Sequence, residues 1–134
     1  MLCFTEHHMN YLELKQTYSD RYNLGACYCR TLFERGGICS YVCKSLKFCK
    51  HSIEKYCKEK EFEVCALKLL SKFQECMYSL ICRATLGNFN LFVTKLDTVL
   101  RNLYNSILEY IICSDSNLNV LIEGERRSQF QALL

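Results

Sequence analysis

The sequence predicts an all-α protein, an antiparallel bundle of about four main helices. Two observations lead to this fold class. The chain has no proline and only five glycines in 134 residues, so few residues interrupt a helix. In several stretches, apolar side chains also recur at steps of three and four residues, which is the period of one helical face.

The first half of the chain predicts two helices separated by a glycine pair. Residues 7–33 carry scattered apolar positions that are compatible with a helix. Gly36 and Gly37 provide a C-cap, and Ser40 is a candidate N-cap for the next helix. That helix has its face at steps of three and four along Cys43, Leu46, Lys50, Ile53 and Cys57.

The second half predicts the two longest helices, over residues 62–82 and 89–112. Asn88 is a candidate N-cap for the second of them, and the Ser-Asp-Ser-Asn run at 114–117 closes it. We expect the two helices to pack against each other. Their apolar faces are formed by Phe62, Cys65, Leu69, Phe73, Cys76 and Leu80, and by Phe92, Leu96, Val99, Leu103, Ile107 and Tyr110.

Length and charge predict one domain over residues 1–134, with an ordered core at about 7–113 and a tail at 114–134 that holds a short helix. The net charge of +3 comes from interspersed basic and acidic residues. Because this pattern offers no concentrated basic patch, we expect no nucleic-acid partner. No apolar run of 18 residues is present, so we expect no transmembrane segment.

Eleven cysteines raise the question of what sulfur does in this protein. A zinc site would use Cys27, Cys29, Cys39 and Cys43 with His51 or Cys57, but paired C-x-x-C knuckles are missing. Neither His7 nor His8 belongs to a nucleophile motif, and both are interpreted as solvated residues. We therefore expect no catalytic residue, no cofactor and no metal. Packing as small core side chains and disulfide formation remain as alternatives.

Helix geometry limits which cysteines could bond. Cys65 and Cys76 share a face of one predicted helix but lie about 16 Å apart along it, so each needs a partner on another helix. Antiparallel packing then favours the pairs Cys43–Cys76 and Cys57–Cys65. The other candidate half-cystines are Cys27, Cys29, Cys39, Cys49, Cys82 and Cys113.

Three segments carry a resemblance to a known family: C-K-S-L-K-F-C at 43–49, Y-C at 56–57 and F-E-V-C-A-L-K-L-L-S-K-F-Q-E-C at 62–76. Over about forty residues the chain resembles a cysteine-rich extracellular domain of unknown function that is expanded in nematodes. The resemblance implies a secreted, non-enzymatic helical module tied by disulfides. The N-terminus departs from it, since it has no basic region followed by an apolar signal core.

These observations predict a protein that is not an enzyme, a secreted interaction or structural module with an unknown protein partner. An alternative is a cytoplasmic helical adaptor of viral or parasite type, with free thiols, that binds a partner protein. A zinc-binding module is the third reading. The oligomeric state and the disulfide connectivity are not determined by the sequence.

Overall fold

The computed structural model describes residues 1–17, 20–33, 35–70, 75–104, 107–118 and 124–133. Strands predominate, so the predicted all-α bundle is wrong. The elements, in chain order, are β1 (Leu2–Thr5), α1 (Tyr11–Gln16), β2 (Tyr22–Tyr28), β3 (Ile38–Cys43), β4 (Lys47–His51), the 3-10 turn η1 (Glu54–Tyr56), β5 (Glu63–Leu70), β6 (Cys76–Cys82), α2 (Phe89–Leu103), β7 (Glu109–Asp115) and α3 (Glu125–Gln131).

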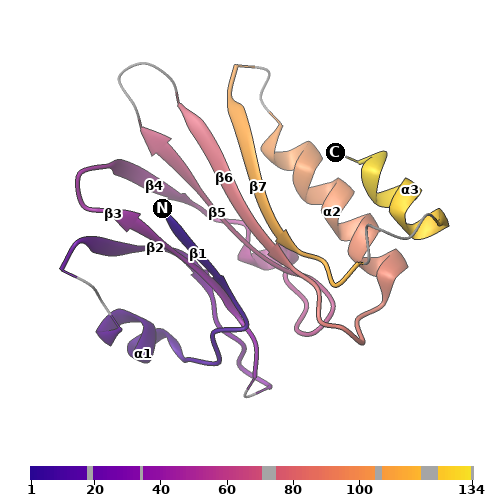
Figure 1. The fold of residues 1–134 in the computed structure, drawn as a ribbon, viewed down its shortest axis with the longest axis horizontal. Helices are drawn as coiled ribbons and strands as arrows, with labels where there is room; N and C mark the ends of the chain where they lie inside the picture. Colours follow the sequence, from indigo (N-terminus) through magenta and orange to yellow (C-terminus); the bar gives the residue numbers. More distant parts are fainter. Residues whose placement is uncertain (18–19, 34, 71–74, 105–106, 119–123, 134) are drawn as a thin grey trace.

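The strands form two sheets packed face to face. One sheet has the order β1-β3-β2 with antiparallel neighbours, and the other has the order β4-β5-β6-β7. In the second sheet β6 and β7 are parallel, and α2 forms the crossover between them. Figure 1 shows the resulting layers: α1, the three-stranded sheet, the four-stranded sheet, and then α2 with α3.

Helix α2 covers the outer face of the four-stranded sheet. The Asn88 side chain accepts a hydrogen bond from the Leu91 N–H and caps the helix, as predicted. The buried side chains of Phe92 and Leu96 lie in one cluster with Phe62, which precedes β5, and with Val64 and Ala66 of β5. The helix ends at Leu103, so the prediction that it continues to residue 112 is wrong, and β7 begins at Glu109.

The two sheets enclose a second core on the other face of β5. There Cys65 and Leu67 pack with Ile38 and Val42 of β3. Gly25 in β2 makes the close approach of the sheets possible, because a Cβ at this position would stand 2.7 Å from Leu67 Cδ2 and 2.9 Å from Ser40 Oγ. Leu67 therefore fills the space above Gly25.

A bulge in β2 beside Gly25 has its backbone groups satisfied by a buried serine. The register between β2 and β3 shifts between Leu24 and Cys27. Ser40 Oγ accepts a hydrogen bond from the Ala26 N–H at 3.0 Å and donates one to the Ala26 carbonyl at 3.2 Å. The predicted N-cap, Ser40, thus serves a bulge in the core and no helix. Gly36 and Gly37 do adopt positive φ, but they lie in the β2–β3 connection and end no helix.

The predicted helix over residues 62–82 is wrong because both faces of β5 are buried. Phe62, Val64 and Ala66 face α2, whereas Cys65 and Leu67 face the other sheet. A strand that is buried on both faces carries a continuous apolar run, and such a run contains helical spacings as well as alternating ones. Phe73, part of the predicted helical face, lies outside the described residues.

The ends of the chain agree with expectation in part. Strand β1 and Asp115, the last residue of β7, lie outside the predicted core of residues 7–113, whereas α3 lies in the tail, where the sequence predicts a short helix. In the part of the chain that the structure describes, no helix is long and apolar enough to span a membrane.

We expect Leu67→Ala to lower the free energy of unfolding by about 2–5 kcal/mol, because it leaves a cavity between the sheets above Gly25. Leu86→Ala is the matched control and should be nearly neutral, since Leu86 is 98% exposed. Urea unfolding followed by circular dichroism measures both. Equal stability of the two variants would contradict the two-sheet core.

Candidate functional site

The ends of β1 and β7 meet across the two sheets. Thr5 is the last residue of β1, and its Oγ1 donates a hydrogen bond to Oδ2 of Asp115, the last residue of β7, at 3.2 Å. The two residues are 110 positions apart in the chain. Asp115 is also the register partner of Cys82, the last residue of β6. Three strand ends therefore converge at one edge of the molecule.

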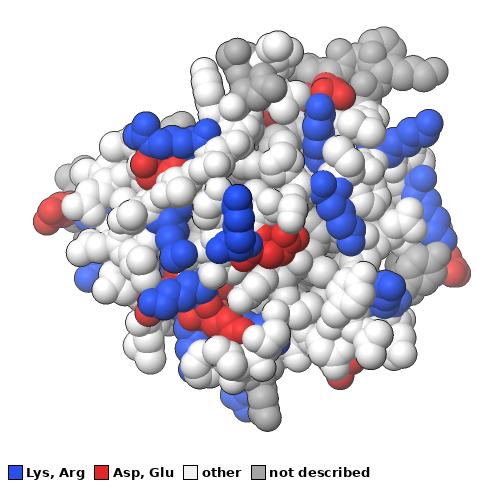
Figure 2. Space-filling view, turned by 180° about the vertical axis from the view of Figure 1, so that it is seen from behind, with Lys and Arg blue, Asp and Glu red and all other residues white. Residues whose placement is uncertain are grey.

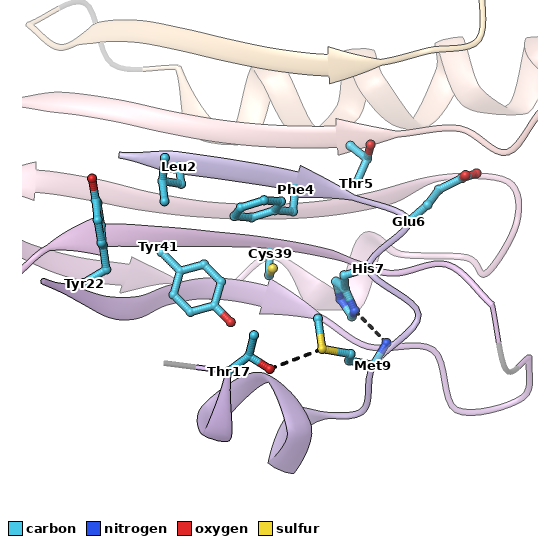
Figure 3. Close-up of a pocket in the computed structure, with 10 residues that line it drawn as sticks. All are labelled: Leu2, Phe4, Thr5, Glu6, His7, Met9, Thr17, Tyr22, Cys39 and Tyr41. Carbon is cyan, nitrogen blue, oxygen red and sulfur yellow. Dashed lines mark hydrogen bonds between the residues drawn. The ribbon is translucent and has the colours of Figure 1, made fainter. Parts of the chain in front are cut away.

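Two carboxylates belong to this edge. Glu6 directly follows Thr5 and has a φ of 51°, a left-handed conformation that is uncommon for a residue other than glycine. Such backbone outliers concentrate at functional sites, where the surrounding structure maintains them. Figure 3 shows the side chains of Thr5 and Glu6 directed away from Cys39 and Tyr41. Glu6 is exposed and Asp115 is half-buried, so neither belongs to a buried core.

The pKa of the Cys82 thiol is affected by the negative charge at this edge. Its pKa is raised to about 12, mainly by burial and in addition by the carboxylates of Glu63, Asp115 and Glu6, whereas Arg30 acts in the opposite direction. Glu63 and Asp115 are the register partners of Cys82 on its two sides, and Glu6 follows the residue that contacts Asp115.

Glu63 differs from the other two carboxylates because its oxygens are already occupied. Its side chain is only 2% exposed and forms an ion pair with Arg30 Nε. It also accepts hydrogen bonds from the Lys60 N–H at 3.2 Å and the Gly37 N–H at 3.1 Å. A buried charge with this set of partners has a structural role. It joins the β2–β3 connection to the start of β5.

His7 and His8 support the loop that carries Glu6. His7 is half-buried, so its interpretation as a solvated residue is wrong, whereas His8 is exposed, as predicted. His7 Nδ1 accepts from the Met9 N–H at 3.0 Å, which leaves the proton of the neutral ring on Nε2, 3.3 Å from the Tyr28 carbonyl. Burial lowers the pKa of His7 and favours this neutral form. His8 Nδ1 accepts from the Gly36 N–H at 2.8 Å.

A cavity of about 340 Å³ borders the same loop on the outer side of the three-stranded sheet. Its wall is formed mainly by apolar side chains, including Leu2, Phe4 and Tyr41, as Figure 3 shows. Thr5, Glu6 and His7 line it where β1 ends. The carboxylate edge therefore stands beside an apolar recess, although the recess itself contains little that could bind a charged group.

All eleven cysteines lie among the described residues, and each is a free thiol. The structure does not bring Cys57 and Cys65 together, because Cys57 packs on the α2 side of the four-stranded sheet and Cys65 between the sheets. Cys43 ends β3 in one sheet, and Cys76 begins β6 in the other. The pairing rested on a helical register that the chain does not have.

The remaining cysteines are mostly packing residues. Cys27, Cys29 and Cys39 lie in the cluster beneath α1, Cys82 and Cys113 lie in or against the core between the sheets, and Cys49 is exposed on β4. Burial raises the pKa of Cys29 to about 11 and that of Cys39 to about 12. Among the described side chains, no three His, Cys, Asp or Glu residues are grouped so that they could bind one metal ion. The hypothesis of a zinc site therefore has no support from the described residues.

Comparison with known proteins identifies a structural likeness. No family model and no curated protein matches the sequence. The structure is similar to the endonuclease domain of TRAS1, a telomere-specific non-LTR retrotransposon, with a TM-score of 0.60 and 9% sequence identity. The match covers 91% of this chain and 60% of that structure, so the chain spans less than two thirds of the TRAS1 domain.

This likeness concerns the fold, and it overturns the expected helical, non-enzymatic module. The expectation that the protein is not an enzyme rested on that helical module, and it is contradicted by the likeness in fold to an endonuclease domain. The nematode resemblance and the extracellular location stay predictions. The sequence-based interpretation did not single out Glu6 or Asp115, although one signal was present: Asp115 lies just after the apolar run at 110–113, where a strand could end.

We expect Cys43 to be alkylated faster than Cys65 or Cys82 in the native protein. The Ser45 hydroxyl lies 3.2 Å from Cys43 Sγ, and its hydrogen bond lowers the pKa of Cys43, so a larger fraction is thiolate at neutral pH. Burial raises the pKa of the other two thiols. Timed iodoacetamide labelling with peptide mass spectrometry measures the order, and Ser45→Ala should slow labelling of Cys43 only.

Proposed function

We propose that this chain forms part of a nuclease domain that cleaves phosphodiester bonds of nucleic acid with the help of a divalent cation. Glu6 and Asp115 are the proposed cation-binding carboxylates. The observation that carries the proposal is the contact between Thr5 and Asp115, which joins the ends of β1 and β7 in a fold similar to that of an endonuclease domain. Fold alone does not determine function, so the proposal depends on the chemistry of these residues.

The donor set fits a hard cation of the magnesium type. Mg²⁺ keeps several water ligands and is usually held by one or two carboxylates together with substrate phosphates. Glu6 and Asp115 are the two carboxylates that we propose for this role, whereas the imidazole nitrogens of His7 are engaged with Met9 and Tyr28. Zinc prefers three or four nitrogen and sulfur ligands, and the described residues do not assemble them.

The cation, when bound, neutralises charge on the phosphate and lowers the pKa of a coordinated water. The chain's own residues orient its ligands. The hydroxyl of Thr5 holds Oδ2 of Asp115. The backbone N–H groups of His7 and His8 donate to the carbonyls of Gly37 and Gly36 and fix the turn that begins at Glu6.

Nucleic acid is the proposed substrate because the similar domain is an endonuclease. The expected absence of a nucleic-acid partner rested on charge that is interspersed along the sequence. Figure 2 shows one face on which Lys and Arg side chains are spread out with Asp and Glu between them. On that face no continuous basic stripe would bind a phosphate backbone, so we assign substrate contact to the edge where β1, β6 and β7 end.

The proposal predicts cleavage that requires a divalent cation and both carboxylates. Supercoiled plasmid should be nicked by the wild-type chain with Mg²⁺ or Mn²⁺ and not with EDTA. Glu6→Gln and Asp115→Asn should each lower the rate by about 10²–10³-fold, the scale seen when one preorganised electrostatic contact is removed. Asp97→Asn is the matched control, because Asp97 pairs with Arg101 on the exposed face of α2 and should leave the rate unchanged.

Cation binding provides a test that does not depend on turnover. Calorimetric titration of Mn²⁺ into the wild-type chain should show one site, and Glu6→Gln or Asp115→Asn should weaken the affinity by at least about tenfold, or 1.4 kcal/mol. Nicking that persists in EDTA would contradict the proposal. A Mn²⁺ affinity that neither substitution changes would do the same.

A further inference from the structure

Arg83 makes contacts with every residue of the turn that begins at Asp115. It directly follows β6, and its backbone N–H donates to the Asp115 carbonyl at 3.0 Å. Its guanidinium donates from Nε to the Ser116 carbonyl at 2.8 Å and from Nη2 to the Asn117 carbonyl at 2.9 Å. Nη1 donates to the Gly87 carbonyl at 2.7 Å.

The contact is reciprocal, because Asn117 returns a hydrogen bond to Arg83. Its Nδ2 donates to the Arg83 carbonyl at 2.7 Å, and its Oδ1 lies 3.4 Å from the Thr85 hydroxyl. Asn117 has a φ of 49°, which is the left-handed conformation that reverses the chain after β7. The turn is thus held from both its main chain and its side chain.

The Arg83 side chain is charged, yet it is buried. It is 4% exposed, and the contacts of its guanidinium are backbone carbonyls and the rings of Phe89 and Phe92, each 5.9 Å from its central carbon. No carboxylate forms an ion pair with it among the described residues. Burial lowers its pKa, as does the nearby Arg126, while Glu61 and Cys82 act in the opposite direction.

A buried cation of this kind is costly for a protein that needs only a stable core, since an apolar side chain would satisfy packing alone. The guanidinium is suited to a different task. Its planar fork aims several N–H donors in fixed directions, so it can hold consecutive carbonyls of a turn in one arrangement. A lysine ammonium in the same place is a point charge on a flexible stem and could not hold all three carbonyls.

We infer that Arg83 is a positioning residue of the proposed nuclease site, which fixes the turn at Ser116 and Asn117 and thereby sets the direction of the Asp115 carboxylate. The inference rests on the proposed function. Thr5 holds one oxygen of that carboxylate from β1, and Arg83 holds its backbone from β6. Asp115 is therefore oriented from both sheets, as supporting residues do for metal ligands in other proteins.

The test uses Mn²⁺ as the probe and the whole chain. Arg83→Lys should weaken Mn²⁺ affinity by about 10- to 100-fold, the usual effect of losing a supporting contact of a metal ligand. Asn117→Gly removes the reciprocal hydrogen bond but keeps a residue that tolerates positive φ, and it should weaken Mn²⁺ in the same direction. Leu67→Ala destabilises the core away from the turn and should leave the affinity unchanged in the folded protein.

Hydrogen exchange of the amides at residues 115–117 provides the second readout. Both Arg83→Lys and Asn117→Gly should increase exchange at these amides selectively, whereas Leu67→Ala should not. If Arg83→Lys fails to fold, Asn117→Gly decides the question alone. Unchanged Mn²⁺ affinity in the folded variants would overturn the positioning role while leaving the proposed site intact. Absence of Mn²⁺ binding by the wild-type chain would instead contradict the proposed function, and the positioning role with it.

Discussion

The contact between the two sheets at Gly25 and Leu67 is the constraint on which the rest of the structure depends. The absent side chain of Gly25 lets Leu67 of the opposite sheet approach the backbone of β2. Ser40 satisfies the backbone of the neighbouring bulge from within the same core, so the close approach leaves no polar group of Ala26 unpaired. This contact sets the spacing of the two sheets over their shared core.

Polar contacts at the strand ends join the two sheets around the candidate site. The ion pair between Arg30 and Glu63 joins the β2–β3 connection to β5, and the hydrogen bond between Thr5 and Asp115 joins β1 to β7. Both contacts cross from one sheet to the other at the same edge. The carboxylate oxygens of Glu63 are occupied by its structural partners, whereas Glu6 and Asp115 lie beside the ends of the strands. The same chemical group thus has a structural role at Glu63 and a proposed cation-binding role at Glu6 and Asp115, because the surroundings differ.

The cysteines have a simpler physical explanation than the sequence suggested. Cysteine is small, apolar and common in buried positions, and Cys39, Cys65 and Cys82 occupy tight places in two cores. The elevated pKa values of these buried thiols keep them protonated, and a protonated thiol is neither a nucleophile nor a metal ligand. All eleven cysteines are free thiols in the structure.

The sequence by itself determined helix α2, because its signals are local: the Asn88 cap and a single apolar face that includes Phe92, Leu96 and Val99. It could not determine residues 62–82, since a run buried on both faces satisfies helical and strand spacing alike, and only packing against α2 and the second sheet selects the strands. The candidate site was decided entirely by the tertiary structure. Glu6 and Asp115 are far apart in the chain and become neighbours of one strand end only when the sheets pack face to face. Local patterns report local hydrogen bonding and one-sided burial, whereas a site made from distant strand ends depends on contacts that no short window contains.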